Sequence, residues 1–197
     1  ISDIHITKYI NNTMKILVCI SSVPDTTSKI NFTADKSAFD KNGIQWVINP
    51  LDEFALTKAI KLQESQGATV TVLNVGDAGT EAVIRKALAI GANDAVRVNA
   101  EAKDSFSVAK EIAKVAQDGG YDLILTGKES IDYNGGAVPG MVAQLLNIPF
   151  VNASVGLDVN GSEATVVREI EGGKETISVK LPAVVAGQKG LVDEKDL

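Results

Sequence analysis

The feature that most constrains this chain is a regular alternation of short apolar runs with longer amphipathic segments. Four runs rich in β-branched and aliphatic residues have the length of buried strands: Lys15 to Ser21, Thr69 to Val75, Ala95 to Val98 and Leu123 to Thr126. Their almost unbroken apolar character is typical of parallel strands that are covered on both faces. The alternation therefore predicts an α/β fold, an open parallel sheet with helices on both faces.

The segments between and after these runs repeat apolar residues at the spacing of an α-helix. The predicted helices are Glu53 to Gln66, Thr80 to Ile90, Ser105 to Gln117 and Val138 to Leu146. The first has a clear start signal, because Asn49 is a favoured N-cap residue and Pro50 suits the first helical position.

The pattern changes after Pro149, where strand-like runs follow one another without helices. They are Phe150 to Val159, Glu163 to Ile170 and Thr176 to Lys180, with Leu181 to Ala186 as a candidate for a further buried strand. Turn residues between these runs favour hairpins. We therefore expect a short antiparallel β extension, about residues 150–181, on the C-terminal side of a single nucleotide-binding domain over residues 14–187.

Both ends of the chain lie outside this predicted domain. Residues 1–13 read as an upstream extension that we expect to be disordered, because Met14 opens the first apolar run like a natural start. Residues 188–197 read as the start of a truncated C-terminal arm. The first residues show no targeting signal, which predicts a cytoplasmic protein.

Composition excludes several classes of function. The 197 residues include 25 Asp and Glu against 19 Lys and Arg, a net charge of -6 that argues against a nucleic-acid binder. One histidine, His5, excludes a histidine triad or a multi-histidine metal site. One cysteine, Cys19, cannot form an internal disulfide and fits a reducing compartment. The longest apolar run is far too short for direct insertion into a membrane.

Common catalytic and nucleotide-binding motifs are absent from the sequence. There is no G-x-G-x-x-G after a strand, no P-loop, no G-x-S-x-G and no C-x-x-C. Three glycine-containing or polar segments nevertheless follow expected strands, where open α/β sheets bind ligands: Cys19 to Pro24, Val75 to Gly79 and Gly127 to Pro139. The last runs into a helix and so predicts a phosphate cradle, although an ordinary glycine-rich loop also explains it.

Several strings together resemble one protein family. NPLDEFAL, IRKALAIGAN, GKESID and REIEGGKETISVKLPAVV occur in this order between Met14 and Val185, and they resemble the β subunit of electron transfer flavoprotein. The resemblance implies an adenine-nucleotide α-hydrolase-like fold and a heterodimer with an α subunit that holds the redox-active FAD. It also implies a structural AMP in the β subunit, or a second FAD in its place in a bifurcating branch.

The resemblance carries the family's binding positions onto this chain. Cys19 and Val75 fall on opposite walls of the adenine pocket, and the turn Asn49, Pro50, Leu51, Asp52 flanks the base. The phosphate loop begins at Gly127, Lys128, Ile131 and Asp132. It then departs from the D-D-C-N-Q-T-G-Q-M of animal and proteobacterial members, continuing with Tyr133, Asn134, Gly135, Gly136, Ala137 and Val138. We expect consecutive backbone amides between Tyr133 and Val138 to hold the phosphate.

The leading hypothesis is therefore a non-catalytic subunit of an electron carrier, which moves electrons from dehydrogenases to a downstream acceptor. Its dehydrogenase partners, of the acyl-CoA or another type, dock in this family through a segment that lies beyond residue 197. One rival is a stand-alone ATP- or AMP-binding stress-type module of the same fold class. An ATP-splitting enzyme of this architecture requires an S-G-G-x-D-S-like loop after the first strand, and ISSVPDTTS does not supply it.

Overall fold

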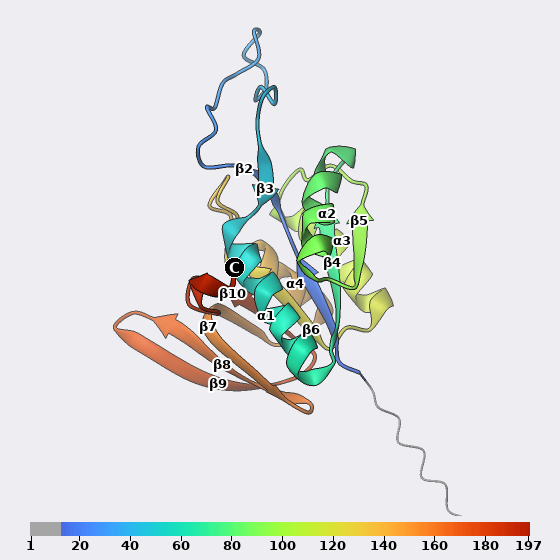
Figure 1. Ribbon diagram of the computed structural model, residues 1–197, viewed down its shortest axis with the longest axis vertical. Coiled ribbons are helices and arrows are strands. Elements are labelled where there is room, and N and C mark those ends of the chain that lie inside the picture. The colour runs from blue at the N-terminus through green and yellow to red at the C-terminus, as the bar shows by residue number, and fades with distance from the viewer. Residues whose placement is uncertain (1–12) are drawn as a thin grey trace, which may run out of the picture.

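The computed structural model describes residues 13–197, so the expectation for the upstream extension lies almost entirely outside the described residues. Eight strands form one sheet in the order β5-β4-β1-β6-β10-β7-β8-β9 (Figure 1). The strands are β1 (Lys15–Cys19), β4 (Thr69–Val75), β5 (Asp94–Val98), β6 (Leu123–Gly127), β7 (Phe150–Asn160), β8 (Glu163–Ile170), β9 (Gly173–Lys180) and β10 (Ala183–Gly187). The helices are α1 (Pro50–Gln66), α2 (Glu81–Ile90), α3 (Ser105–Gly119) and α4 (Val138–Leu146), with short 3-10 turns at Ala78–Thr80 and Glu194–Asp196.

The strand pairing confirms the α/β class and corrects the extent of its parallel part. All neighbours from β5 to β7 pair in parallel, and β8 and β9 then continue the same sheet in antiparallel fashion. The candidate strand after Leu181 is β10, which lies between β6 and β7 in the middle of the sheet. The expected antiparallel extension over about residues 150–181 is therefore only partly antiparallel, because the start of β7 belongs to the parallel sheet together with β10.

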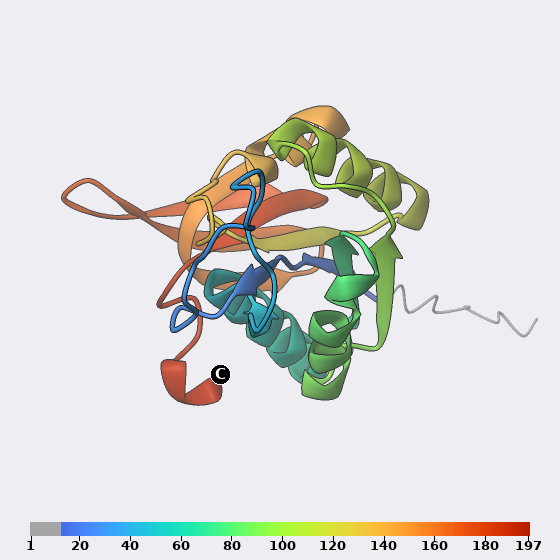
Figure 2. The same cartoon turned by 90° about the horizontal axis from the view of Figure 1, so that it is seen from above.

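Helices cover both faces of the parallel part, as predicted, and they do so in two pairs (Figure 2). On β1, Ile16 and Val18 face α1 and α2, whereas Leu17 and Cys19 face α3 and α4. This division follows from the two-residue period of a strand, which sends successive side chains to opposite faces. Both faces of the central strands are thus buried, which explains their continuous apolar runs.

The connections reverse direction between β1 and β6. The chain passes from β1 to β4 and β5 on one side, and then crosses back to β6 and β10 on the other. This reversal is the topological switch point of an open α/β sheet, where ligands bind outside the carboxyl ends of the strands. The fold therefore places the candidate site next to the residues that follow β1 and β6.

A hairpin between β1 and α1 was not expected from the sequence. Strands β2 (Ser22–Pro24) and β3 (Trp46–Ile48) pair in antiparallel fashion and support an arm, residues 25–45, that projects beyond the sheet (Figure 1). Phe39 packs edge-to-face on Trp46 at 6.3 Å between ring centroids. Ile30 and Phe32 of the arm are exposed.

Residues 188–197 return to the domain instead of leaving it. Leu191 and Val192 are buried in the cluster on the α1 side, and Lys61 of α1 forms an ion pair with Asp196. The expected start of a longer arm is therefore anchored on α1, and its continuation stays a prediction.

The antiparallel extension depends on apolar residues in register across its three strands. Leu157, Val166 and Ile177 pair with one another and pack on the α1 side. We expect Leu157→Ala to lower the free energy of unfolding by about 2–5 kcal/mol, because it leaves a cavity in this row. Urea denaturation measures the effect, with Thr165→Ala on the exposed face as a control that changes stability by less than about 0.5 kcal/mol. Equal losses in both variants would contradict this packing.

Candidate functional site

The site is built where β1 and β6 separate at their carboxyl ends. Their pairing runs from Ile16 with Leu123 to Val18 with Leu125 and then stops. Beyond that point, backbone N–H groups of the two strands have no ladder partner on each other. Such groups need another acceptor when they are buried.

The Asp52 carboxylate supplies that acceptor from the first turn of α1. Its Oδ2 accepts a hydrogen bond from the Ser21 N–H and its Oδ1 accepts one from the Gly127 N–H, each at 2.7 Å. The residue is only 4% exposed, so the carboxylate is committed to these backbone groups. Asp52 therefore joins the ends of β1 and β6 across the switch point.

Burial makes this carboxylate unusual in its ionisation. Loss of solvent raises the pKa of Asp52 to about 7, while the hydrogen bonds from Ser21 and Gly127 favour the charged form and oppose this rise. Carboxyl groups with strongly shifted pKa values cluster at functional sites, and the raised pKa of Asp52 agrees with its place at the switch point.

Gly127 is required by the same contact. A Cβ at this position would lie 2.5 Å from Asp52 Oδ1 and 2.8 Å from Leu51 Cβ. Only glycine lets the end of β6 approach the first turn of α1 this closely.

Asn49 occupies the N-cap position of α1 and Pro50 the first turn, as predicted, but the Asn49 side chain does not cap the helix and instead holds the next part of the loop. The backbone carbonyl of Asn49 accepts from the N–H groups of Asp52 and Glu53 at 2.8 and 3.1 Å. Its buried side chain donates from Nδ2 to the Glu129 carbonyl at 2.9 Å and accepts at Oδ1 from the Ile131 N–H at 3.2 Å. Pro50 and Leu51 lie between these two anchors as the first residues of α1.

The predicted phosphate loop is a closed turn followed by free amides. Ser130 and Gly135 exchange backbone hydrogen bonds at 3.2 and 3.3 Å, and Asn134 adopts a left-handed φ of 49°. The Tyr133 N–H donates to Asp132 Oδ1 at 3.0 Å, and the Tyr133 side chain is 88% exposed.

The N–H groups of Tyr133 and Gly135 are therefore already engaged in hydrogen bonds within the loop. The run of amides available to a phosphate is shorter than the predicted run from Tyr133 to Val138. Within residues 13–197, no hydrogen bond uses the N–H groups of Gly136, Ala137 and Val138. They stand at the start of α4, where the helix dipole adds partial positive charge. The backbone carbonyl of Lys128 lies close to Gly136, 3.2 Å from where a Gly136 Cβ would be. The three free N–H groups fit a phosphate group.

Of the residues predicted to flank an adenine ring, Cys19 and Val75 lie on the α3 and α4 side of the sheet, whereas Leu51 packs against the cluster on the α1 side. Cys19 is buried in the cluster on the α3 and α4 side, and Val75 and Val138 are half-buried against the same cluster. Burial, with a smaller contribution from the Asp52 charge, raises the pKa of the Cys19 thiol, which stays neutral. Cys19, Val75 and Val138 thus form one apolar wall, which Val138 joins to the free amides. Cys19 contributes little accessible surface to this wall, because it is only 7% exposed.

Sequence reasoning missed Asn74. This buried residue of β4 donates from Nδ2 to the Ile20 carbonyl at 2.9 Å and so joins the ends of β4 and β1. Its Oδ1 has no hydrogen-bond partner among the described residues. The available signal was a lone amide side chain in the β-branched and aliphatic run Thr69 to Val75.

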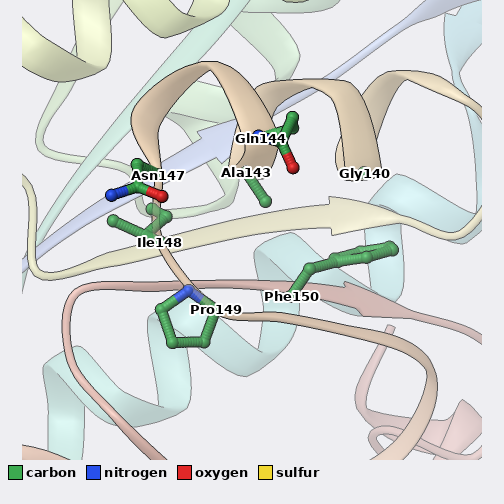
Figure 3. Close-up of a pocket in the computed structure, with 7 residues that line it drawn as sticks. All are labelled: Gly140, Ala143, Gln144, Asn147, Ile148, Pro149 and Phe150. Carbon is green, nitrogen blue, oxygen red and sulfur yellow. The ribbon is translucent and has the colours of Figure 1, made fainter.

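A clear surface pocket lies elsewhere, in the corner between α4 and β7 (Figure 3). It has a volume of about 320 Å³ and contains none of the predicted site residues. Its lining residues are Gly140, Ala143, Gln144, Asn147, Ile148, Pro149 and Phe150. The candidate site is therefore supported by its donors and its place in the fold, not by the depth of a cavity.

Two other kinds of feature are lacking in the part of the chain that the structure describes. No helix there has the length and apolar character needed to cross a membrane. No three His, Cys, Asp or Glu side chains gather there in a way that would hold a metal ion.

Most of the chain is similar in sequence to proteins of one known family. The profile of the family described as electron transfer flavoprotein domain matches residues 37–197. The electron transfer flavoprotein subunit beta of Bacillus subtilis is 37% identical over 182 residues, which are 90% of this chain and 70% of the relative. That of Thermoanaerobacterium thermosaccharolyticum is 33% identical, covering 90% of this chain and 69% of the relative. Protein FixA of Azotobacter vinelandii is 33% identical, covering 90% and 66%.

The close approach at Gly127 yields a matched test on two glycines. We expect Gly127→Ala to lower the free energy of unfolding by roughly 1–3 kcal/mol, because the added methyl overlaps Asp52 and the Leu51 backbone. Gly135→Ala meets nothing within 4 Å and is the control, with an effect below about 0.5 kcal/mol. Chemical denaturation of both variants checks this, and a tolerated Gly127→Ala would contradict the contact.

The raised pKa of Asp52 predicts a pH dependence of stability. Because the native state holds this proton more tightly than the unfolded chain, stability contributed by the neutral acid is lost as pH rises from about 4 to about 7. The wild type should therefore lose stability relative to Asp52→Asn over this window. Urea titrations of both proteins at several pH values measure the difference, and a constant difference would contradict the raised pKa.

Proposed function

The chain belongs to the electron transfer flavoprotein β-subunit family, and we propose that it binds a structural AMP at the carboxyl edge of its sheet. We also propose that it pairs with an α subunit and helps to enclose the FAD that the α subunit holds. The heterodimer then carries electrons from dehydrogenases to a downstream acceptor. FAD supplies the redox chemistry when it is bound, and this chain supplies the fixed protein surface beside it.

One observation carries the AMP proposal. The free N–H groups of Gly136, Ala137 and Val138 stand at the start of α4, beside the switch point and next to the apolar wall formed by Cys19 and Val75. A phosphate and an adenine ring need these two surfaces in this order. The assigned binding positions stay predictions until a nucleotide is observed.

The proposed role needs no bond-making residue in this chain. Among the described residues at the site, Asp52 and Asn49 are committed to backbone groups, and Cys19 is a buried neutral thiol. The subunit would position and cover a flavin held mainly by another chain. Docking of acyl-CoA or other dehydrogenases and a cytoplasmic location also remain part of the proposal.

The same amides would donate hydrogen bonds equally well to the phosphate of AMP or to that of a second FAD, as in a bifurcating subunit. Co-expression with the α subunit, followed by acid release and chromatography of the bound nucleotides, distinguishes the two. One FAD and one AMP per heterodimer support the proposal. Two FAD and no AMP identify the bifurcating type, and a nucleotide without any flavin would favour the stress-type module.

A substitution at Gly136 tests the phosphate position. We expect Gly136→Val to weaken AMP binding at least tenfold, roughly 1.4 kcal/mol, because its methyl groups obstruct the amides that would hold the anion. Isothermal titration of AMP into nucleotide-free heterodimer measures the affinity. Gly173→Val is the control, since this glycine begins β9 and has open space around it. Equal affinities in wild type and Gly136→Val would mean that the phosphate lies elsewhere.

A further inference from the structure

We propose that the Asp52 side chain is a positioning residue for the nucleotide site, and that its ionised form is the one that supports tight binding. The carboxylate acts through the backbone that it holds, without contacting the nucleotide. This inference rests on the proposed AMP site and concerns how that site is held together.

The first argument is the position of the two hydrogen bonds. Ser21 follows β1, which carries Cys19 of the apolar wall, and Gly127 ends β6, which leads into the phosphate loop. Asp52 bonds to both N–H groups at 2.7 Å and thereby fixes the distance between the two halves of the site. Losing either bond would let these halves move apart.

The second argument is that the same turn holds the phosphate loop at two more points. Asn49 lies three residues before Asp52 in the chain, and its side chain forms hydrogen bonds with the backbone of Glu129 and Ile131. The turn that starts α1 thus bonds both to the residue that follows β1 and to the loop that follows β6. A nucleotide bound between these two segments would contact the segments themselves and not the turn, yet its affinity would depend on the turn that holds them.

The third argument concerns the proton. An ionised carboxylate accepts both hydrogen bonds, whereas the neutral acid turns one acceptor oxygen into a hydroxyl and weakens one of them. The groups that face Asp52 are the Cys19 thiol on β1, the amide of Asn49, and Ser21 and Gly127. Among the described residues none of these carries a charge that would fix Asp52 in one state. The protonation state of Asp52 therefore changes with the pH of the solution.

The test compares Asp52→Asn with Glu53→Gln. Both variants remove one negative charge from the first turn of α1, but Glu53 is half-exposed and pairs with Lys86 on α2 at 2.7 Å. AMP is titrated into the nucleotide-free heterodimer at about pH 8.5 and about pH 5.5, on either side of the Asp52 pKa of about 7. Affinities are compared between proteins at each pH, which cancels the titration of AMP itself.

We expect Asp52→Asn to bind AMP roughly tenfold more weakly than wild type at the higher pH, because one charge-assisted hydrogen bond is lost. At the lower pH the two should converge, since the protonated wild type then resembles the amide. Glu53→Gln should match wild type at both values. Equal affinity, or tighter binding by Asp52→Asn at the higher pH, would overturn the inference. A wild type that does not bind AMP at all would instead overturn the proposed function.

A second measurement needs no variant and covers the case in which Asp52→Asn does not fold. The amide resonances of Ser21 and Gly127 in the wild type should titrate together with one midpoint. By linkage, AMP should lower that midpoint if it prefers the ionised form. A midpoint that rises or does not move on addition of AMP would overturn the inference.

Discussion

The Asp52 carboxylate is the contact on which the candidate site depends. Two parallel strands that separate at the switch point leave buried N–H groups, and an unpaired buried donor costs about 1–3 kcal/mol. A single carboxylate from the start of α1 satisfies one such group on each strand. The same contact explains why position 127 is a glycine, because a Cβ there would lie 2.5 Å from Asp52 Oδ1. The hydrogen bonds of Asp52 therefore connect the sheet, the first turn of α1 and the candidate site.

The strands and helices of the parallel body were predictable because each has its own apolar period. The strand over Thr69–Val75 and the helix over Val138–Leu146 occur with the predicted bounds. The place of β10 was not predictable, because a strand's neighbours are set by contacts distant in sequence. Its run from Ala183 to Ala186 shows burial but not that it would lie between β6 and β7. The arm over residues 25–45 lacks a strong period and was missed for that reason.

The candidate site was predicted less completely than the fold. Local pattern marks Asn49 as a helix cap, but its side chain instead reaches a loop 80 residues further along the chain. Asp52 likewise reads as an ordinary acidic residue in a first helical turn, and only the fold brings it to Gly127, 75 residues away. Sequence reasoning placed both residues at the site through family resemblance, and it did not reveal what their side chains do.

The proposed phosphate loop departs from the side chains expected from the family resemblance at the same residues whose backbone N–H groups are free. A donor supplied by a side chain is lost when that side chain changes, whereas an N–H at the start of a helix is fixed by the backbone. Replacing polar residues by Gly136, Ala137 and Val138 therefore removes side-chain donors and leaves three backbone donors in place. What must then be preserved is the position of the loop, and the side chains of Asn49 and Asp52 hold that position from outside it. In such a site, the residues that determine affinity need not be those that touch the ligand.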